Sequence, residues 1–334
     1  MSESVNLLGF PSEQSLGKVL EMSDLLRIVF MGTAELAATV LRSLVRDSRW
    51  TVVSAVSQPD KPRGRDLVLQ PTPVKLCALE WGLPVDQPQK ARNPEFLERL
   101  KKLAPDLIVV AAYGQLLPQE LLDVPRYGCL NIHTSLLPRY RGAAPIQWAI
   151  VDGLIETGGT LMKMDAGLDT GPIVTTARTL ILDTDTGQTL HDRLAEMGGR
   201  LLISGLPEYV AGTLVPRLQP MEGATVARKI TREDGRIRWE RSSVETWRRL
   251  RAFTPWPGAF CEVSGGSRSR ILKVHAAHPV EGEGEPGRVL GSGRGRLVVG
   301  CGTGALELTE VQIEGGKRMG AASFLAGNPI EILT

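Results

Sequence analysis

The sequence predicts an α/β fold, a Rossmann-like, mostly parallel sheet with helices on both faces, followed by a small C-terminal β-barrel domain of OB-like type. The sheet is predicted because short, wholly apolar runs alternate with segments of helical periodicity. The barrel is predicted because the apolar runs after residue 226 are short and separated by glycine clusters. A chain of 334 residues is long enough for two such domains.

The elements follow in order along the chain. An apolar run at 26–31 precedes Gly32-Thr33 and a helical pattern, which predicts a strand, a turn and a helix. Later strands are predicted over 51–57, 106–113, 128–132, 160–167 and 171–181, and later helices over 73–82, 93–103, 143–153, 186–210 and 242–253. The stretch 58–75, rich in Pro and Arg, predicts a long loop.

Four segments are expected. Residues 1–25 form a disordered extension, since the folded pattern starts abruptly at Arg27 (a natural start at Met22 would explain the same feature). The first domain spans 26–210 and the second spans 227–334. Between them, 211–226 loses periodicity, gains Gly and Pro, and is predicted to be a linker.

Composition limits the possible classes. Hydrophobic residues make up 42% and charged residues 23%, as in ordinary globular proteins. The apolar run at 107–112 is too short to span a bilayer, and the N-terminus does not read as a signal peptide. The four cysteines are scattered without a CxxC pair, which favours a reducing compartment over a disulfide framework or a zinc site: Cys77, Cys129, Cys261 and Cys301. We therefore expect a cytoplasmic monomer without a membrane partner.

The charge is uneven. Residues 211–334 hold 18 of the 39 Lys+Arg and 13 of the 37 Asp+Glu, a net charge of +5, which leaves −3 for the rest of the chain. A basic second half is compatible with a polyanionic partner and equally with an uneven solvated surface.

Two conventional motifs fail on inspection. Gly32 is the only glycine of a dinucleotide fingerprint that needs three, so a plain turn is favoured there. His275 and His278 have no carboxylate or cysteine at ligand spacing, so no metal site is predicted. His191 has no partner in its sequence neighbourhood.

Asn131 and His133 form a more informative pair. They point to the same face of a strand and lie at its carboxyl end, where open α/β sheets bind ligands. An amide beside an imidazole is costly to bury without a ligand or water. Asp165 and Asp169, in a glycine loop after a strand of the same sheet, are expected to reach the same rim.

The chemistry of these groups suggests a reaction class. An amide donates to a developing oxyanion, an imidazole accepts or donates a proton, and a carboxylate orients the imidazole. No activated Ser or Cys is present, since Ser135 lies on a turn only two residues after His133. The group therefore suits acyl transfer to an amine without a covalent enzyme intermediate.

Motifs along nearly the whole chain from Arg27 carry a resemblance to a known family. They are VFMGTAE (29–35), SQPDKPRGR (57–65), PTPVK (71–75), VVAAYGQLLP (109–118), NIHTSLLPRYRGAAPIQWAI (131–150), MDAGLDTGPI (164–173) and RAFTPWPGAF (251–260). The chain resembles the folate-dependent formyltransferases, most closely the members that act on methionyl-tRNA. The implied reaction moves the formyl group of 10-formyltetrahydrofolate to initiator methionyl-tRNA, and no metal is implied.

The resemblance also implies site residues. The catalytic trio is Asn131, His133 and Asp169. The folate pocket is lined by Gln115, Leu116, Leu117, Ser135, Leu136, Leu137 and Pro138. The loop 59–75 would reach toward the tRNA acceptor end. Candidate phosphate contacts are taken from this loop and from the basic run 227–251: Arg63, Arg65, Arg228, Lys229 and Arg232.

We expect Asn131 to bind the oxyanion, His133 to relay the proton from amine to folate, and Asp169 to orient His133 through a water. The chain departs from the family at Ala34, where proline is common, and at Asp66-Leu67, where lysines are usual. The second departure weakens the electrostatic case for the loop; either Arg65 suffices or the apolar stretch 67–69 contacts the terminal base pair.

Three alternatives remain at this point. A sugar-nucleotide N-formyltransferase would share the trio but leaves PTPVK and the basic run unexplained. A formyltetrahydrofolate hydrolase would use water as acceptor and leaves the basic second domain unexplained. A non-catalytic tRNA-binding module would not need the complete trio.

Overall fold

The computed structural model describes residues 25–63, 68–265, 268–291, 295–328 and 330–334. The extension expected over 1–25 lies outside these ranges except for its last residue. Arg65, Asp66 and Leu67 also lie outside them.

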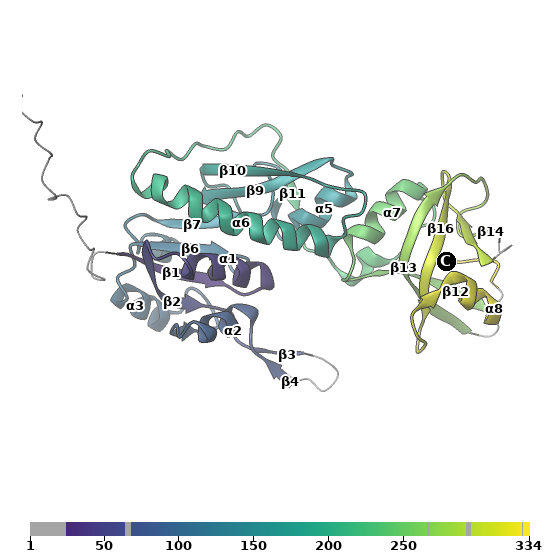
Figure 1. Ribbon diagram of the computed structural model, residues 1–334, viewed down its shortest axis with the longest axis horizontal. Helices are drawn as coiled ribbons and strands as arrows, with labels where there is room; N and C mark the ends of the chain where they lie inside the picture. The colour runs from purple at the N-terminus through teal and green to yellow at the C-terminus, as the bar shows by residue number, and fades with distance from the viewer. Residues whose placement is uncertain (1–24, 64–67, 266–267, 292–294, 329) are drawn as a thin grey trace, which may run out of the picture.

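A seven-stranded sheet forms the centre of the first domain, in the order β10-β9-β7-β6-β1-β2-β5 (Figure 1). The five strands from β7 to β5 pair in parallel, and β9 runs antiparallel to both its neighbours. This confirms the predicted mostly parallel sheet. The strands are β1 (Leu26–Gly32), β2 (Trp50–Val56), β5 (Val85–Asp86), β6 (Leu107–Ala111), β7 (Cys129–His133), β9 (Glu156–Lys163) and β10 (Ile173–Leu180).

Helices cover both faces of this sheet, as predicted. Ile28 and Phe30 of β1 pack into a core shared with α1, α2, α5 and α6, whereas Val29 and Met31 pack into a second core shared with α3 and α4. The helices are α1 (Glu35–Val45), α2 (Pro73–Glu80), α3 (Pro94–Lys102), α4 (Gln119–Leu122), α5 (Pro145–Val151) and α6 (Gly187–Val210). Within the described ranges, no helix combines the length and apolar character of a membrane span.

Local sequence explains where the helices start. Thr72 accepts a hydrogen bond from the backbone N–H of Lys75 at 3.2 Å, and proline occupies the first position of α2. Asn93 caps α3 in the same way through the N–H of Phe96 at 3.1 Å. These caps satisfy amide groups that have no partner inside the helix.

The stretch 58–75 contains a hairpin, so the prediction of an unbroken loop there is wrong. β3 (Lys61–Arg63) pairs antiparallel with β4 (Val68–Gln70), and the hairpin projects from the sheet (Figure 1). Val68 and Leu69 are 59% and 66% exposed. The strand residues whose burial is described, Lys61, Pro62 and Val68–Gln70, are all exposed, so the alternation that would reveal a strand in sequence is missing.

The second domain is an antiparallel sheet in the order β12-β13-β16-β15-β14, with β17 paired to β16, curled into a half-barrel. This confirms the barrel-like C-terminal domain of the predicted fold class. Its core contains Trp239, Leu272 and Phe324. Its elements are β12 (Ala259–Gly265), β13 (Arg268–Val280), β14 (Val289–Gly291), β15 (Leu297–Gly300), β16 (Ala305–Ile313), β17 (Met319–Gly320) and α8 (Ala321–Gly327).

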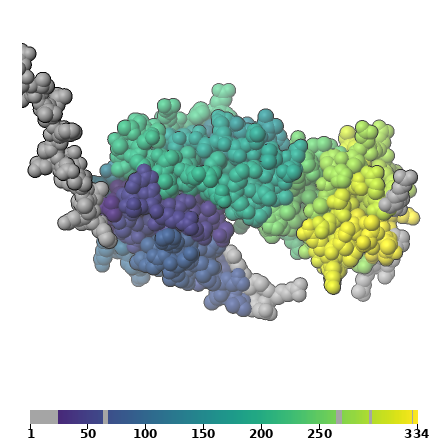
Figure 2. Space-filling model, viewed as in Figure 1, coloured from purple at the N-terminus to yellow at the C-terminus, as the bar shows by residue number. Residues whose placement is uncertain are grey.

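Helix α7 (Ser243–Ala252) joins the two domains. Its Leu250 packs in the core of the half-barrel, while Phe253 packs in the core of the first domain, edge-on to Trp148 with ring centroids 6.4 Å apart. The space-filling view accordingly shows an elongated molecule in which the half-barrel abuts the first domain (Figure 2).

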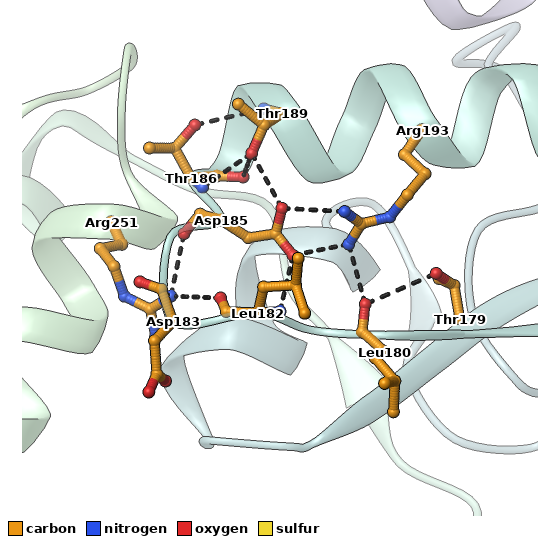
Figure 3. Close-up of polar contacts among 9 residues, drawn as sticks. All are labelled: Thr179, Leu180, Leu182, Asp183, Asp185, Thr186, Thr189, Arg193 and Arg251. Atoms are coloured by element: carbon orange, nitrogen blue, oxygen red, sulfur yellow. Dashed lines mark hydrogen bonds and ion pairs between the residues drawn. The ribbon is translucent and has the colours of Figure 1, made fainter.

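A buried arginine strengthens this junction (Figure 3). Nη1 of Arg251 donates to the backbone carbonyls of Leu182, Asp183 and Asp185 at 2.8, 2.9 and 3.0 Å. The carboxylate of Asp185 is in turn bound by Arg193 at 2.6 Å. Burial opposes ionisation of Asp185, but its hydrogen bonds with Arg193 and with the N–H of Leu182 outweigh burial and lower the pKa.

Candidate active site

Strand β7 carries Asn131 and His133 on one face, as its period of two requires. Cys129 shares this face and packs in the core beneath α3 and α4, so the two polar side chains lie on that side of the sheet. They are only 8% and 6% exposed. A strand end with two nearly buried polar side chains is costly unless their partners are provided.

The ring of His133 is held by one backbone contact. Its Nε2 lies 2.9 Å from the carbonyl oxygen of Tyr140, so Nε2 must carry a hydrogen and Nδ1 is the ring nitrogen left for chemistry. Tyr140 is itself fixed, because its N–H donates to Thr225 and its hydroxyl to Asp152, each at 2.8 Å. Burial, followed by the bond to Asp152, raises the pKa of Tyr140 to about 12.

Asp169 reaches His133 by a route that the sequence did not predict. Because β9 is antiparallel to β7, its end at Lys163 pairs beside Leu130, away from the end of β7 that carries His133. The N–H of Met164 then bonds to the carbonyl of Cys129 at 2.8 Å. The prediction that the loop after β9 starts at the same edge of the sheet as His133 is therefore wrong. Loop 164–172 instead starts at the opposite end of β7 and folds back over the face of the sheet.

At the turn of this loop, Asp169 meets His133. Oδ2 of Asp169 lies 3.6 Å from Nδ1 of His133 and accepts a hydrogen bond from the N–H of Gly142 at 2.8 Å. The first distance is longer than a direct hydrogen bond, and the contact is an ion pair only when the ring is protonated. Asp165 instead accepts from Gly167 and Thr170 at 3.0 and 2.7 Å and closes its own loop. The structure thus brings Asp169, and not Asp165, to His133.

The amide of Asn131 is the least committed group here. In the part of the chain that the structure describes, its side chain makes no hydrogen bond. A nearly buried amide beside His133 is therefore available to an acceptor atom of a bound molecule. No group of three or more potential metal ligands occurs among the described residues.

The residues expected to line a folate pocket follow two neighbouring strands, β6 and β7, and differ in their exposure. Leu116 is 68% exposed, while Leu117 is buried. Gln115 uses its side chain internally, accepting from the N–H of Ala91 at 2.9 Å and donating to Gln89 at 3.2 Å. Its Nε2 keeps a second hydrogen, and the residue is partly exposed.

Of the expected pocket residues after β7, two are buried and hydrogen-bonded within the protein. Ser135 is buried and donates to the carbonyl of Arg139 at 2.6 Å, and Leu137 is buried with its N–H bonded to Thr160 at 3.2 Å. Among the side chains of this set, Leu116 is the most exposed, and Gln115, Leu136 and Pro138 are partly exposed.

The basic residues expected to contact tRNA divide in two. Arg63 ends β3, while Arg65 and the side chain of Arg63 lie outside the described parts. Arg228 binds Asp234 at 2.5 Å and lies 4.6 Å from the ring of Trp148, so its charge is already compensated. Lys229 and Arg232 are exposed and have no ion pair among the described residues.

A groove of about 770 Å³ opens where the domains meet, lined by residues of α5, the 228–241 segment and α7. Two arginines that line it, Arg241 and Arg248, have no ion pair within the described chain and were not singled out from the sequence. Both belong to the basic run 227–251, in which composition does not tell paired arginines from unpaired ones.

Asp234 binds Arg228 and Arg249, two of the arginines that line this groove. The side-chain hydrogen bond from Arg228, assisted by the N–H of Thr231, lowers the pKa of Asp234 far below its usual value although burial opposes the shift. A folded pKa below the unfolded one means stabilisation that is complete above about pH 4 and is lost as the pH falls further.

We expect Asp234→Asn to lower the free energy of unfolding by about 2 kcal/mol at pH 7, because charge-assisted hydrogen bonds are lost. The difference from the natural protein should shrink between pH 4 and pH 2. Urea unfolding at several pH values measures both effects. Glu80→Gln, at an exposed carboxylate of α2, is the control, and an equal acid response of the Asp234 variant and the natural protein would contradict the assignment.

Comparison with known proteins assigns this chain to a family. Residues 26–206 match the family described as "Formyl transferase", and residues 229–329 match "Formyl transferase, C-terminal domain". A methionyl-tRNA formyltransferase of Myxococcus xanthus is 49% identical over 304 residues, covering 91% of this chain and 96% of that protein. A methionyl-tRNA formyltransferase of Geobacter sulfurreducens is 46% identical, covering 92% and 95%.

Solved structures agree on the fold. HypX from Aquifex aeolicus in complex with tetrahydrofolic acid has a TM-score of 0.59 at 20% identity, covering 90% of this chain and 46% of that one. WlaRD, a sugar 3N-formyl transferase, has a TM-score of 0.62 at 16% identity, covering 85% and 97%. With both domains matched in order along the chain, this protein belongs to the formyl transferase family and is a formyl-transferring enzyme.

Proposed function

We propose that this protein transfers the formyl group of 10-formyltetrahydrofolate to the amino group of initiator methionyl-tRNA. The observation that carries the proposal is the uncommitted amide of Asn131 beside a His133 whose Nδ1 faces Asp169. Relatives with 46–49% identity, named for this reaction, support the choice of acceptor. The folate donor is supported by the family and by a fold neighbour solved with tetrahydrofolic acid.

In the proposed mechanism, the methionine amine attacks the formyl carbon and the carbonyl oxygen gains negative charge. The N–H of the Asn131 amide donates to this oxygen. Nδ1 of His133 takes the proton that the amine loses and returns one to the folate nitrogen as its bond to the formyl carbon breaks. Between these two proton transfers the ring of His133 is positively charged. Asp169 stabilises that charge, because its carboxylate lies 3.6 Å from Nδ1.

Positioning supplies much of the remaining rate. The exposed side chain of Leu116, the partly exposed side chain of Leu136 and backbone groups of the 112–117 and 134–138 loops would hold the flat folate ring. Bringing amine and formyl carbon together in the right orientation contributes on the order of 7–11 kcal/mol in favourable cases.

An acceptor assay tests the proposal. Purified protein is given 10-formyltetrahydrofolate with methionyl-tRNA, an amino-sugar nucleotide or no acceptor, and transfer of a labelled formyl group is followed. We expect methionyl-tRNA to react at least about a hundredfold faster than the other two, since only it uses the whole recognition surface. Uncharged tRNA is the control for non-specific labelling. Faster labelling of the sugar nucleotide, or equally fast release of formate without an acceptor, would refute the proposal.

A further inference from the structure

The segment 211–226, expected to be a simple linker, is hydrogen-bonded to the loops around Asp169 at several points. Arg217 exchanges two backbone hydrogen bonds with Ile173 at 2.7 and 2.8 Å. Farther along, β11 (Val226–Ala227) pairs with β8 (Arg141–Gly142), the strand that supplies the N–H bound to Asp169. The segment therefore packs beside the loop that carries Asp169 and is hydrogen-bonded to its surroundings.

Gln219 is the residue of this segment whose side chain is hydrogen-bonded to the Asp169 loop. Its Nε2 donates to the carbonyl oxygens of Asp169 and Gly171 at 2.8 and 2.7 Å. Its Oε1 accepts from Nε and Nη2 of Arg141 at 3.0 and 2.7 Å. The two carbonyls require the NH₂ group of the amide, and the two guanidinium N–H groups require its oxygen. The orientation of the Gln219 amide is therefore fixed by its partners.

These contacts close a ring around Asp169. The backbone carbonyl of Asp169 is held by Gln219, Gln219 is held by Arg141, and the next residue, Gly142, holds the carboxylate of Asp169. Asp169 needs such support because its φ of +52° lies in the left-handed region, which is unfavourable for a residue with a side chain. A relaxed backbone at this position would move the carboxylate away from His133.

We infer that Gln219 is a positioning residue, which acts on the reaction by holding Asp169 against His133; this inference rests on the proposed function. Gln219→Met keeps the length of the side chain and removes both ends of the network. Gln219→Glu keeps the bond to Arg141 but places a negative oxygen against two carbonyls. Both variants should lower kcat roughly ten- to a hundredfold and leave KM for either substrate within about twofold.

A double-mutant cycle separates positioning from a general structural role. In an Asp169→Asn background, Gln219→Met should lower kcat no more than about twofold further, because its effect passes through the carboxylate. Leu218→Ala, in the same segment and 85% exposed, is the matched control and should behave as the natural protein. An equal loss in both backgrounds, or an unchanged kcat for Gln219→Met, would overturn the inference.

A second readout does not depend on the acceptor. The amide resonance of Gly142 reports its bond to Asp169 in ¹⁵N-labelled protein. Gln219→Met should shift this resonance and speed its hydrogen exchange at least about tenfold, while Leu218→Ala leaves both unchanged. An unchanged Gly142 amide would refute the positioning role even if the enzyme proved to use another acceptor, and a changed one would uphold it.

Discussion

His133→Ala is expected to lower the rate of formyl transfer about a hundredfold or more while KM for both substrates changes little. The ring is nearly buried, its Nε2 is occupied by the carbonyl of Tyr140, and only Nδ1 faces Asp169. Removing it deletes the proton relay, whose typical contribution is 10²–10⁴-fold. Single-turnover formylation with excess enzyme measures the chemical step directly.

The control for this variant is His278→Ala, because His278 is a half-exposed histidine of the half-barrel. It should keep the natural turnover. Asn131→Ala should lose roughly the same factor as His133→Ala through the oxyanion. Near-normal single-turnover rates for His133→Ala would exclude the ring from proton transfer and require another base.

Much of this site follows from strand periodicity. Asn131 and His133 are two residues apart in an apolar run, so a shared face was predictable, as was the position of the run in a sheet covered on both sides. The half-barrel was likewise predictable from short apolar runs between glycines.

Other features depend on facts that a single sequence does not contain. The path of Asp169 follows from the direction of β9, and apolar runs look alike in parallel and antiparallel strands. Gln219 contacts backbone carbonyls far along the chain, and such contacts leave no pattern in sequence. The described residues of the β3–β4 hairpin are exposed on both faces, so hydrophobic spacing could not reveal it.

The proposed tRNA contact is a second large expected effect, and it rests on unpaired charge. Lys229, Arg232, Arg241 and Arg248 have no ion pair among the described residues, whereas Arg228 is neutralised by Asp234. If these four each contact one phosphate, binding should weaken roughly 50- to 150-fold between 50 and 200 mM salt, because each contact releases about 0.7–0.9 of a counterion. Filter binding or fluorescence anisotropy with methionyl-tRNA measures the slope.

Single substitutions then distinguish a groove from a diffuse basic surface. Arg241→Ala and Arg248→Ala, which line the groove, should each reduce the slope of log K against log salt by about 1. Lys317→Ala removes the same charge from the turn between β16 and β17, outside the groove, and should leave the slope unchanged. Equal effects of all three substitutions would mean that tRNA responds only to the net charge of this half of the chain. A groove-specific loss would instead mean that the domain junction, held rigid by Arg251, sets where the tRNA lies relative to His133.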